Sequence, residues 1–133
     1  MPPKLDLIGI IVRDMPAALN FYRQLGWDIP AAMDTEGHVE YVLPSGLRIA
    51  WDTQEVIRMF EPDWQPPTGS HRGGMAFLCA NPAEVDALYA RLTGMGYASH
   101  KAPWDAFWGQ HYAQVEDADG NVVDLFCPLE QSS

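Results

Sequence analysis

The chain has 133 residues, of which 47% are hydrophobic and 20% charged, and its formal net charge at pH 7 is −10. This length and composition predict one compact globular domain over residues 1–133 and exclude a disordered chain. Only eight Lys and Arg residues are present, so we expect no nucleic-acid partner, because phosphate neutralisation needs clustered cations. No apolar run approaches the roughly 20 residues that span a bilayer, so we expect no membrane partner either.

The N-terminal stretch MPPKLDLIGI lacks the charged flank, the long apolar run and the cleavage site of a signal peptide. We therefore expect a cytoplasmic protein. Cys79 and Cys127 both lie in apolar, strand-like runs, where the usual state of a cytosolic cysteine is a reduced, buried thiol. These two residues are not expected to form a functional disulfide.

The first half of the chain has the pattern of a strand, a helix and three more strands. The run KLDLIGIIVR is apolar and β-branched, which is typical of a strand. Asp14 as N-cap and Pro16 in the first turn predict a helix that ends at Gly26. Three strands are expected after this helix, the last two joined by the turn PSG, at residues 27–33, 38–43 and 47–52.

The second half repeats this order. GMAFLCA is a predicted strand, and Asn81, Pro82 and Glu84 have the form of a helix start with an N-cap, a first-turn proline and a capping-box acid. The stretches YASHK, HYAQVE and NVVDLFC are the three strands that follow, and the turn DADG separates the last two. The shared order of proline, tyrosine, leucine, glycine and aromatic residues indicates one βαβββ unit copied once.

Residues 53–72 form a linker between module one, at about 4–52, and module two, at about 73–128. Its first part predicts a short amphipathic helix on Val56, Ile57 and Phe60, and the stretch EPDWQPPTGSHR is a proline-punctuated loop. A linker of this length allows the modules to pair within one chain or between two chains. The sequence leaves both arrangements open.

The duplicated module, the FY near the end of the first helix and the ending EDADGNVVDLF together resemble the vicinal-oxygen-chelate superfamily. That superfamily includes glyoxalase I, extradiol dioxygenases, fosfomycin-modifying enzymes and drug-binding proteins of the bleomycin-resistance type. The resemblance covers nearly the whole chain. It implies an α+β fold in which two tandem βαβββ modules form a cleft-shaped, eight-stranded mixed sheet, paired across a homodimer.

The resemblance also implies four metal-ligand positions, and most of them lack a donor atom in this chain. They fall at Leu7, Ala50, Gly73 or Gly74, and Asp124. Of these residues only Asp124 can bind a metal, whereas a catalytic ion normally has three protein ligands. We therefore expect no metal and no cofactor.

The chain is most similar to the metal-free, antibiotic-binding members of the bleomycin- and mitomycin-resistance type. The matching stretches are LRIAWDT, EPDWQPPTGSHR and PWDAFWGQHYAQVEDADGNVVDLF. In that group a homodimer binds a planar drug between aromatic rings and does not change it. The resemblance therefore implies sequestration of a planar or polycyclic small molecule, with antibiotic resistance as the result and no catalytic residue.

The polar candidates for ligand contact come from the alternation of side chains along strands. Arg48 and Asp52 point to the same face as Ala50, so we expect both to supply polar contacts in the cleft. Asp124 reaches the cleft by the same count. For Asp124 a structural role also stays open, with its carboxylate bonded to a neighbouring strand or to Arg48, because a buried carboxylate must be paired in either case.

The aromatic candidates are His38 and the run PWDAFWGQHY. That run has no clear strand or helical period, so we expect a loop, and a loop rarely buries several large aromatic side chains completely. His38 and Trp108 are the expected stacking walls, with Phe107 and Trp104 around them. For the two tryptophans, a dimer contact or a lid over the core stays open.

The alternative function is an enzyme. One form is a glyoxalase- or dioxygenase-like enzyme with a rebuilt metal site, for which the strand residues available are His38, Glu40, Asp52 and His111. The other form is a metal-free isomerase or cyclase that acts on an unknown metabolite with Asp124 as its base.

Overall fold

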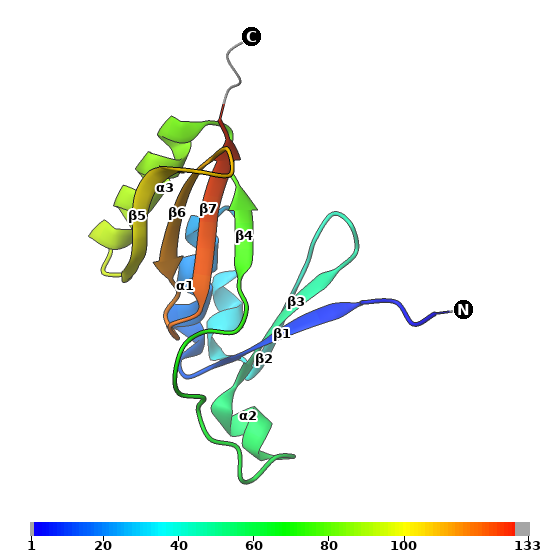
Figure 1. The fold of residues 1–133 in the computed structure, drawn as a ribbon. Helices are drawn as coiled ribbons and strands as arrows, with labels where there is room; N and C mark the ends of the chain where they lie inside the picture. The colour runs from blue at the N-terminus through cyan, green and yellow to red at the C-terminus, as the bar shows by residue number, and fades with distance from the viewer. Residues whose placement is uncertain (1, 130–133) are drawn as a thin grey trace. The chain divides into compact units, whose positions relative to one another are not determined.

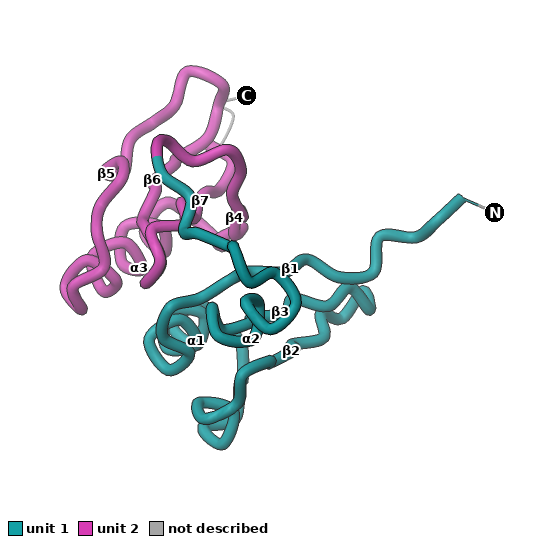
Figure 2. Tube along the Cα trace, turned by 90° about the horizontal axis from the view of Figure 1, so that it is seen from below, with its two compact units in different colours: residues 1–68 teal, residues 69–133 magenta. Residues whose placement is uncertain are grey.

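The structure is a computed structural model that describes residues 2–129 (Figure 1). The chain divides into two compact units, Met1–Thr68 and Gly69–Ser133 (Figure 2). Unit 1 contains β1 (Leu7–Val12), α1 (Met15–Gln24), the 3-10 helix η1 (Ala31–Thr35), β2 (His38–Val42), β3 (Arg48–Thr53) and α2 (Gln54–Arg58). Unit 2 contains β4 (Met75–Leu78), α3 (Pro82–Gly94), β5 (Ser99–Ala106), β6 (Gln110–Glu116) and β7 (Val122–Pro128).

The architecture is α+β, as predicted, with one sheet of three strands and one of four. The short helix expected at the start of the linker is α2. The proposed single domain, its linker and its module boundaries stay predictions. Among the helices of residues 2–129, none has the length and apolar character needed to cross a bilayer.

The sheet of unit 1 has the strand order β1-β3-β2, with β1 parallel and β2 antiparallel to β3. One face packs on α1, where the ring centroids of Tyr22 and Trp51 lie 5.5 Å apart and both side chains are fully buried. Asp14 caps α1 by accepting a hydrogen bond from the backbone N–H of Ala17 at 3.2 Å. The predicted helix start is therefore confirmed, and Tyr22 and Trp51 belong to the core of this unit.

The strand predicted at residues 27–33 is wrong, since the structure has irregular backbone followed by η1 in this segment. The guanidinium of Arg23 donates hydrogen bonds to the carbonyl oxygens of Ile29 at 2.8 Å and Pro30 at 3.0 Å, and pairs with Asp34 at 2.8 Å. These bonds satisfy carbonyl groups that a strand would satisfy across a sheet. Residues 2–129 therefore form seven strands rather than the eight expected.

The sheet of unit 2 has the strand order β4-β7-β6-β5 (Figure 1). Asn81 caps α3 by accepting a hydrogen bond from the backbone N–H of Glu84 at 2.8 Å, as predicted. The alternation along β7 buries Val123, Leu125 and Cys127 on the α3 side and leaves Asp124 on the other face, half-buried. Both cysteines are free, buried thiols.

The aromatic run at 103–112 is strand at seven of its ten residues, four in β5 and three in β6, which corrects the expected loop. β5 extends to Ala106 and includes Pro103 and Trp104, and its pairing with β6 shifts register on either side of Lys101. Because β5 is the edge strand of its sheet, a proline and bulges are tolerated there. A three-residue turn follows, in which Gly109 adopts φ 93° and its N–H bonds the carbonyl of Ala106 at 3.0 Å.

Candidate functional site

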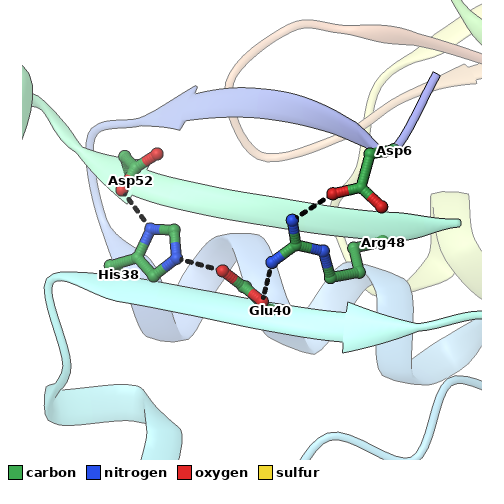
Figure 3. A network of polar contacts seen from close by, with 5 residues as sticks. All are labelled: Asp6, His38, Glu40, Arg48 and Asp52. Carbon is green, nitrogen blue, oxygen red and sulfur yellow. Dashed lines mark hydrogen bonds and ion pairs between the residues drawn. The ribbon is translucent and has the colours of Figure 1, made fainter. Parts of the chain in front are cut away.

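The open face of the unit 1 sheet carries a chain of charged side chains (Figure 3). The ring nitrogen Nδ1 of His38 lies 2.5 Å from Asp52 Oδ1, and its Nε2 lies 2.7 Å from Glu40 Oε2. Arg48 donates one hydrogen bond to Glu40 Oε1 at 2.9 Å and another to Asp6. Negative and positive groups therefore alternate along the chain.

The strands explain this arrangement. His38 and Glu40 are two residues apart on β2, so their side chains share a face. The register of β2 with β3 sets His38 opposite Asp52 and Glu40 opposite Ala50. Ala50 itself is fully buried, and Gly9 of β1 lies on its other side. The small side chains of Ala50 and Gly9 leave room above the middle of this face for the longer charged side chains beside them.

The two carboxylates beside His38 change its acid–base behaviour. The hydrogen bond to Glu40 and then that to Asp52 raise the pKa of His38 above its ordinary value. The bond from His38 and then that from Arg48 lower the pKa of Glu40. Ionised carboxylates accept and do not donate, so these two contacts favour the imidazolium form of His38, in which both ring nitrogens donate.

In unit 2, an aromatic group surrounds Trp108. The ring of Trp108 lies 4.9 Å from that of Phe107, 5.2 Å from that of Tyr112 and 5.5 Å from that of Trp104, in each case edge to face. Its indole N–H donates to Gln110 Oε1 at 2.7 Å. These contacts fix the ring of Trp108 while 47% of the residue stays exposed. Phe107 is 89% exposed, and the edge-to-face contact with Trp108 is its ring contact in this group.

Asp124 forms hydrogen bonds to the neighbouring strand β6. This is the structural role that the sequence left open beside ligand contact. Its carboxylate accepts hydrogen bonds from the hydroxyl of Tyr112 and, at 2.9 Å, from the side-chain amide of Gln114. Burial, and then the bond to Asp124, raise the pKa of Tyr112 to about 12. Tyr112 therefore connects the ring of Trp108 with the carboxylate of Asp124.

A hollow of about 280 Å³ lies next to Asp124 within unit 2. It is lined by His71, Arg72, Gly73, Gly74, Gln114, Val122 and Asp124. The glycine pair leaves this hollow without side chains on one side. The resemblance assigns a metal ligand to Gly73 or Gly74, just before β4, and both residues line this hollow.

The structure brings some of the predicted site residues together. His38, Arg48 and Asp52 form one network in unit 1, and Trp104, Phe107 and Trp108 form one aromatic group in unit 2. Sequence reasoning missed four partners of these residues: Asp6, Gln110, Tyr112 and Gln114. Strand alternation could have found Tyr112 and Gln114. They are two residues apart on β6, so their side chains point to the same face, and Gln114 lies opposite Asp124 on β7.

The residues at the four expected metal positions do not fit a metal. Leu7 and Ala50 have no donor atoms, and a side chain at Gly74 would place its Cβ 2.6 Å from the carbonyl oxygen of Val122. Asp124 already accepts two hydrogen bonds. Within residues 2–129, no three His, Cys, Asp or Glu side chains form a group able to hold a metal ion. No chemical step is therefore assigned to a metal here.

The short distance between Gly74 and the backbone of Val122 can be tested by substitution. Replacing Gly74 with Ala is expected to lower the free energy of unfolding by about 1–3 kcal/mol, because the new methyl group collides with backbone. Gly73→Ala is the matched control, since nothing lies within 4 Å of its Cβ position, and it is expected to be neutral or slightly stabilising. Urea unfolding of both variants measures the difference, and equal stabilities would contradict the account.

His111 lies on the α3 side of the unit 2 sheet, away from the residues above. Its Nε2 is 2.7 Å from Asp86 Oδ1 on α3 and its Nδ1 is 2.7 Å from Asp105 Oδ1 on β5. The bond to Asp86 raises the pKa of His111 most strongly, with burial opposing and the bond to Asp105 assisting. His111 thus joins a helix and two strands, a structural role instead of the metal-ligand role weighed for it.

This pairing predicts how stability depends on pH. A group whose pKa is higher in the folded state stabilises the fold below its unfolded pKa of about 6.5, and the contribution disappears as pH rises through the folded pKa. We expect the free energy of unfolding to fall as pH rises above about 6.5, with His38 adding a contribution of the same sign. Asp86→Asn should make this fall smaller, measured by urea unfolding between pH 6 and 9. An unchanged pH profile in Asp86→Asn would exclude the role of His111.

Comparisons with known proteins agree with the α+β fold. Residues 4–125 match the model of the Glyoxalase/Bleomycin resistance protein/Dioxygenase superfamily, and the chain belongs to that superfamily. A comparison with curated protein sequences gave no significant match.

Three solved structures illustrate the structural likeness. A glyoxalase/bleomycin resistance protein/dioxygenase family enzyme from Burkholderia phytofirmans PsJN is 20% identical, with a TM-score of 0.80 over 96% of this chain and 100% of that one. A glyoxalase/bleomycin resistance protein/dioxygenase from Nocardioides is 23% identical, with a TM-score of 0.72 over 100% and 88%. A lactoylglutathione lyase from Agrobacterium tumefaciens is 18% identical, with a TM-score of 0.64 over 96% and 95%. At these identities the likeness establishes the fold alone.

Proposed function

We propose that this protein is a cytoplasmic, metal-free binding protein that sequesters a planar or polycyclic small molecule. The class of ligand we propose is an antibiotic. The observation that supports it most is Trp108, a large ring fixed by three aromatic contacts and one hydrogen bond and still 47% exposed. A ring held in place loses little conformational freedom when a flat ligand stacks on it. His38 offers a second flat surface, with Phe107, Trp104 and Asp124 as supporting contacts in unit 2 and Arg48 and Asp52 in unit 1.

The polar groups favour binding over catalysis. Both ring nitrogens of His38 are used by carboxylates, and both oxygens of Asp124 already accept hydrogen bonds. A general base needs a lone pair that reaches the substrate proton, and hydrogen bonds to a carboxylate lower its basicity. A metal-free isomerase or cyclase with Asp124 as its base is therefore the weaker proposal.

We further propose that the protein works as a homodimer. β1 and β4 lie at the edges of their sheets, and edge strands are the places where sheets extend or must be covered. Leu78 on β4 is 69% exposed, which fits a surface that another subunit covers. Sedimentation equilibrium tests this part, and a strictly monomeric protein at micromolar concentration would exclude it.

The binding proposal is tested by titrating the purified protein with mitomycin-, bleomycin- and quinoxaline-type compounds while following tryptophan fluorescence. We expect saturable quenching by at least one planar member of this panel, because the exposed ring of Trp108 would contact the ligand. Quenching that rises linearly with concentration for every compound would be collisional and would contradict the proposal.

A further inference from the structure

The two cysteines of unit 2 lie side by side on neighbouring strands. β4 runs parallel to β7, and the last pair of their register is Leu78 with Phe126. Cys79 and Cys127 are the next residues along the two strands. The backbone N–H of Cys79 donates to the carbonyl oxygen of Phe126 at 2.7 Å, which continues the ladder by one residue. Cys79 is therefore the direct neighbour of Cys127, although the two are far apart in the sequence.

Their side chains point to the same face of the sheet. Cys127 lies on the α3 side with Leu125, and Phe77 is the neighbour of Leu125 on β4. Cys79 follows Phe77 by two residues, so its side chain also points to the α3 side. Both thiols are buried, with 5% of Cys79 and 1% of Cys127 exposed. The two sulfur atoms therefore lie on one buried face beneath α3.

The spacing of the strands suits a bond between these thiols. Neighbouring strands lie about 4.7–4.9 Å apart, and the Cα atoms of a disulfide are usually about 4.4–6.8 Å apart. The Cβ atoms of two abreast residues stay near the strand spacing, slightly beyond the roughly 3.5–4.5 Å of a disulfide. A bond between Cys79 and Cys127 thus requires a small approach of β4 to β7. Such strain makes the bond easy to reduce, as in disulfides that form and break in response to oxidants.

The surroundings keep both thiols reduced in the resting protein. The reactive form of cysteine is the thiolate. Burial, followed by the charges of Glu84 and of Cys127, raises the pKa of Cys79. Burial, followed by the charges of Asp86 and Asp105, raises the pKa of Cys127. Few thiolates therefore exist at neutral pH, so mild oxidants leave the pair unchanged, in line with the reduced state expected from the sequence.

Cys79 is the residue of the pair that an oxidant reaches first. It lies in the short connection between the end of β4 and the start of α3, next to Ala80, which is exposed. Cys127 lies within β7, which has β4 on one side and β6 on the other. A small opening of the connection exposes Cys79 and leaves Cys127 in place behind it. Cys79 is thus suited to react with the oxidant, and Cys127 to react with the oxidised Cys79.

We propose that Cys79 and Cys127 form an oxidation site, a buried dithiol that a peroxide converts into a reversible disulfide. The disulfide would join the edge strand β4 to its neighbour β7. This inference is independent of the proposed binding function, which uses the opposite face of this sheet.

The reaction has two steps. In the first, the thiolate of Cys79 attacks one oxygen of hydrogen peroxide, the O–O bond breaks, and Cys79 becomes a sulfenic acid. The hydroxide that leaves takes up the proton released by the thiol and becomes water. In the second step, the sulfur of Cys127 attacks the sulfur of Cys79, and the S–O bond breaks with loss of water. Two thiols are oxidised, and one peroxide is reduced to two molecules of water.

The test counts the free thiols that remain after oxidation. The reduced, purified protein is treated with increasing hydrogen peroxide, unfolded in urea and labelled with N-ethylmaleimide, which marks each remaining thiol. We expect both labels to be lost together and to return after treatment with dithiothreitol. A digest should contain a peptide pair joined through Cys79 and Cys127, identified by mass spectrometry. The wild-type protein alone gives this result, so the test does not depend on the folding of a variant.

Single substitutions separate the roles of the two cysteines. Cys127→Ser removes the second thiol, so the sulfenic acid of Cys79 should persist and react with dimedone at least about fivefold more than in the wild-type protein. Cys79→Ser is the matched control. Its remaining thiol, Cys127, is the more deeply buried of the two and should keep its label at the dose that oxidises the wild-type protein.

Two kinds of result would overturn the proposal and leave the binding function untouched. The first is retention of both labels in the folded protein at a peroxide dose that oxidises the urea-unfolded protein. The second is loss of the labels to disulfides between molecules or to sulfinic and sulfonic acids, because neither product needs two adjacent thiols. Equal dimedone labelling of the wild-type protein and Cys127→Ser would likewise exclude Cys127 as the partner of Cys79.

Discussion

Replacing Trp108 with Ala is expected to weaken the binding of a planar ligand at least about tenfold, equivalent to about 1.4 kcal/mol. The reason is that the indole ring supplies a stacking surface fixed by Phe107, Tyr112, Trp104 and Gln110. Calorimetric titration with a compound that saturates the wild-type protein measures the loss.

A matched control removes a tryptophan elsewhere. Trp64 lies in unit 1 and packs under the guanidinium of Arg58 at 5.3 Å. Trp64→Ala therefore removes an indole ring that is not one of the proposed ligand contacts, and its ligand affinity should stay within about twofold of wild type. Equal losses in the two variants, or an unchanged affinity in Trp108→Ala, would show that Trp108 is not a stacking surface.

Replacing Tyr112 with Phe is expected to destabilise the protein by about 1.5–3 kcal/mol, the usual cost of losing a hydrogen bond to a charged, partly buried group. The hydroxyl of Tyr112 donates to Asp124, whereas its ring contacts Trp108. The substitution removes the first interaction and keeps the second. Urea unfolding measures the change.

Tyr89→Phe is the control, because Tyr89 donates to the neutral hydroxyl of Ser99 at 2.6 Å in an exposed setting, and its loss should cost about 1 kcal/mol or less. Asp124→Asn supplies a second measurement. It should lower the pKa of Tyr112 from about 12, seen in the ultraviolet titration of tyrosine, and it should make Tyr112→Phe less costly in a double-mutant cycle. Additive effects of the two substitutions would contradict the pairing.

Local signals in the sequence were sufficient for most of the fold. Asp14 and Asn81 cap their helices as predicted, and the alternation along β3 placed Arg48 and Asp52 on the same face. The strand expected at residues 27–33 failed because Arg23, earlier in the chain, satisfies the carbonyl groups there. A side chain that bonds the backbone six residues away leaves no periodic pattern to read.

Strand alternation was sufficient to predict which polar side chains of the site share a face of the sheet. Arg48 and Asp52 were placed on one face by their spacing along β3, whereas the spacing gave no such placement for His38. The raised pKa of His38 was not predictable, because it depends on hydrogen bonds to Glu40 and Asp52 that only the paired strands bring together. The expected loop around Trp104 was in part a bulged edge strand, where proline and register shifts disguise the pattern of a strand.

The central claim is that the protein holds its ligand without changing it, and one measurement tests this most directly. The protein is incubated with a saturating compound from the panel, separated from free compound, and denatured, and the released molecule is quantified by mass spectrometry. The account predicts recovery of the compound at its original mass, in an amount proportional to the protein and constant with time. A product of altered mass or isomeric form, accumulating beyond the amount of protein, would contradict it.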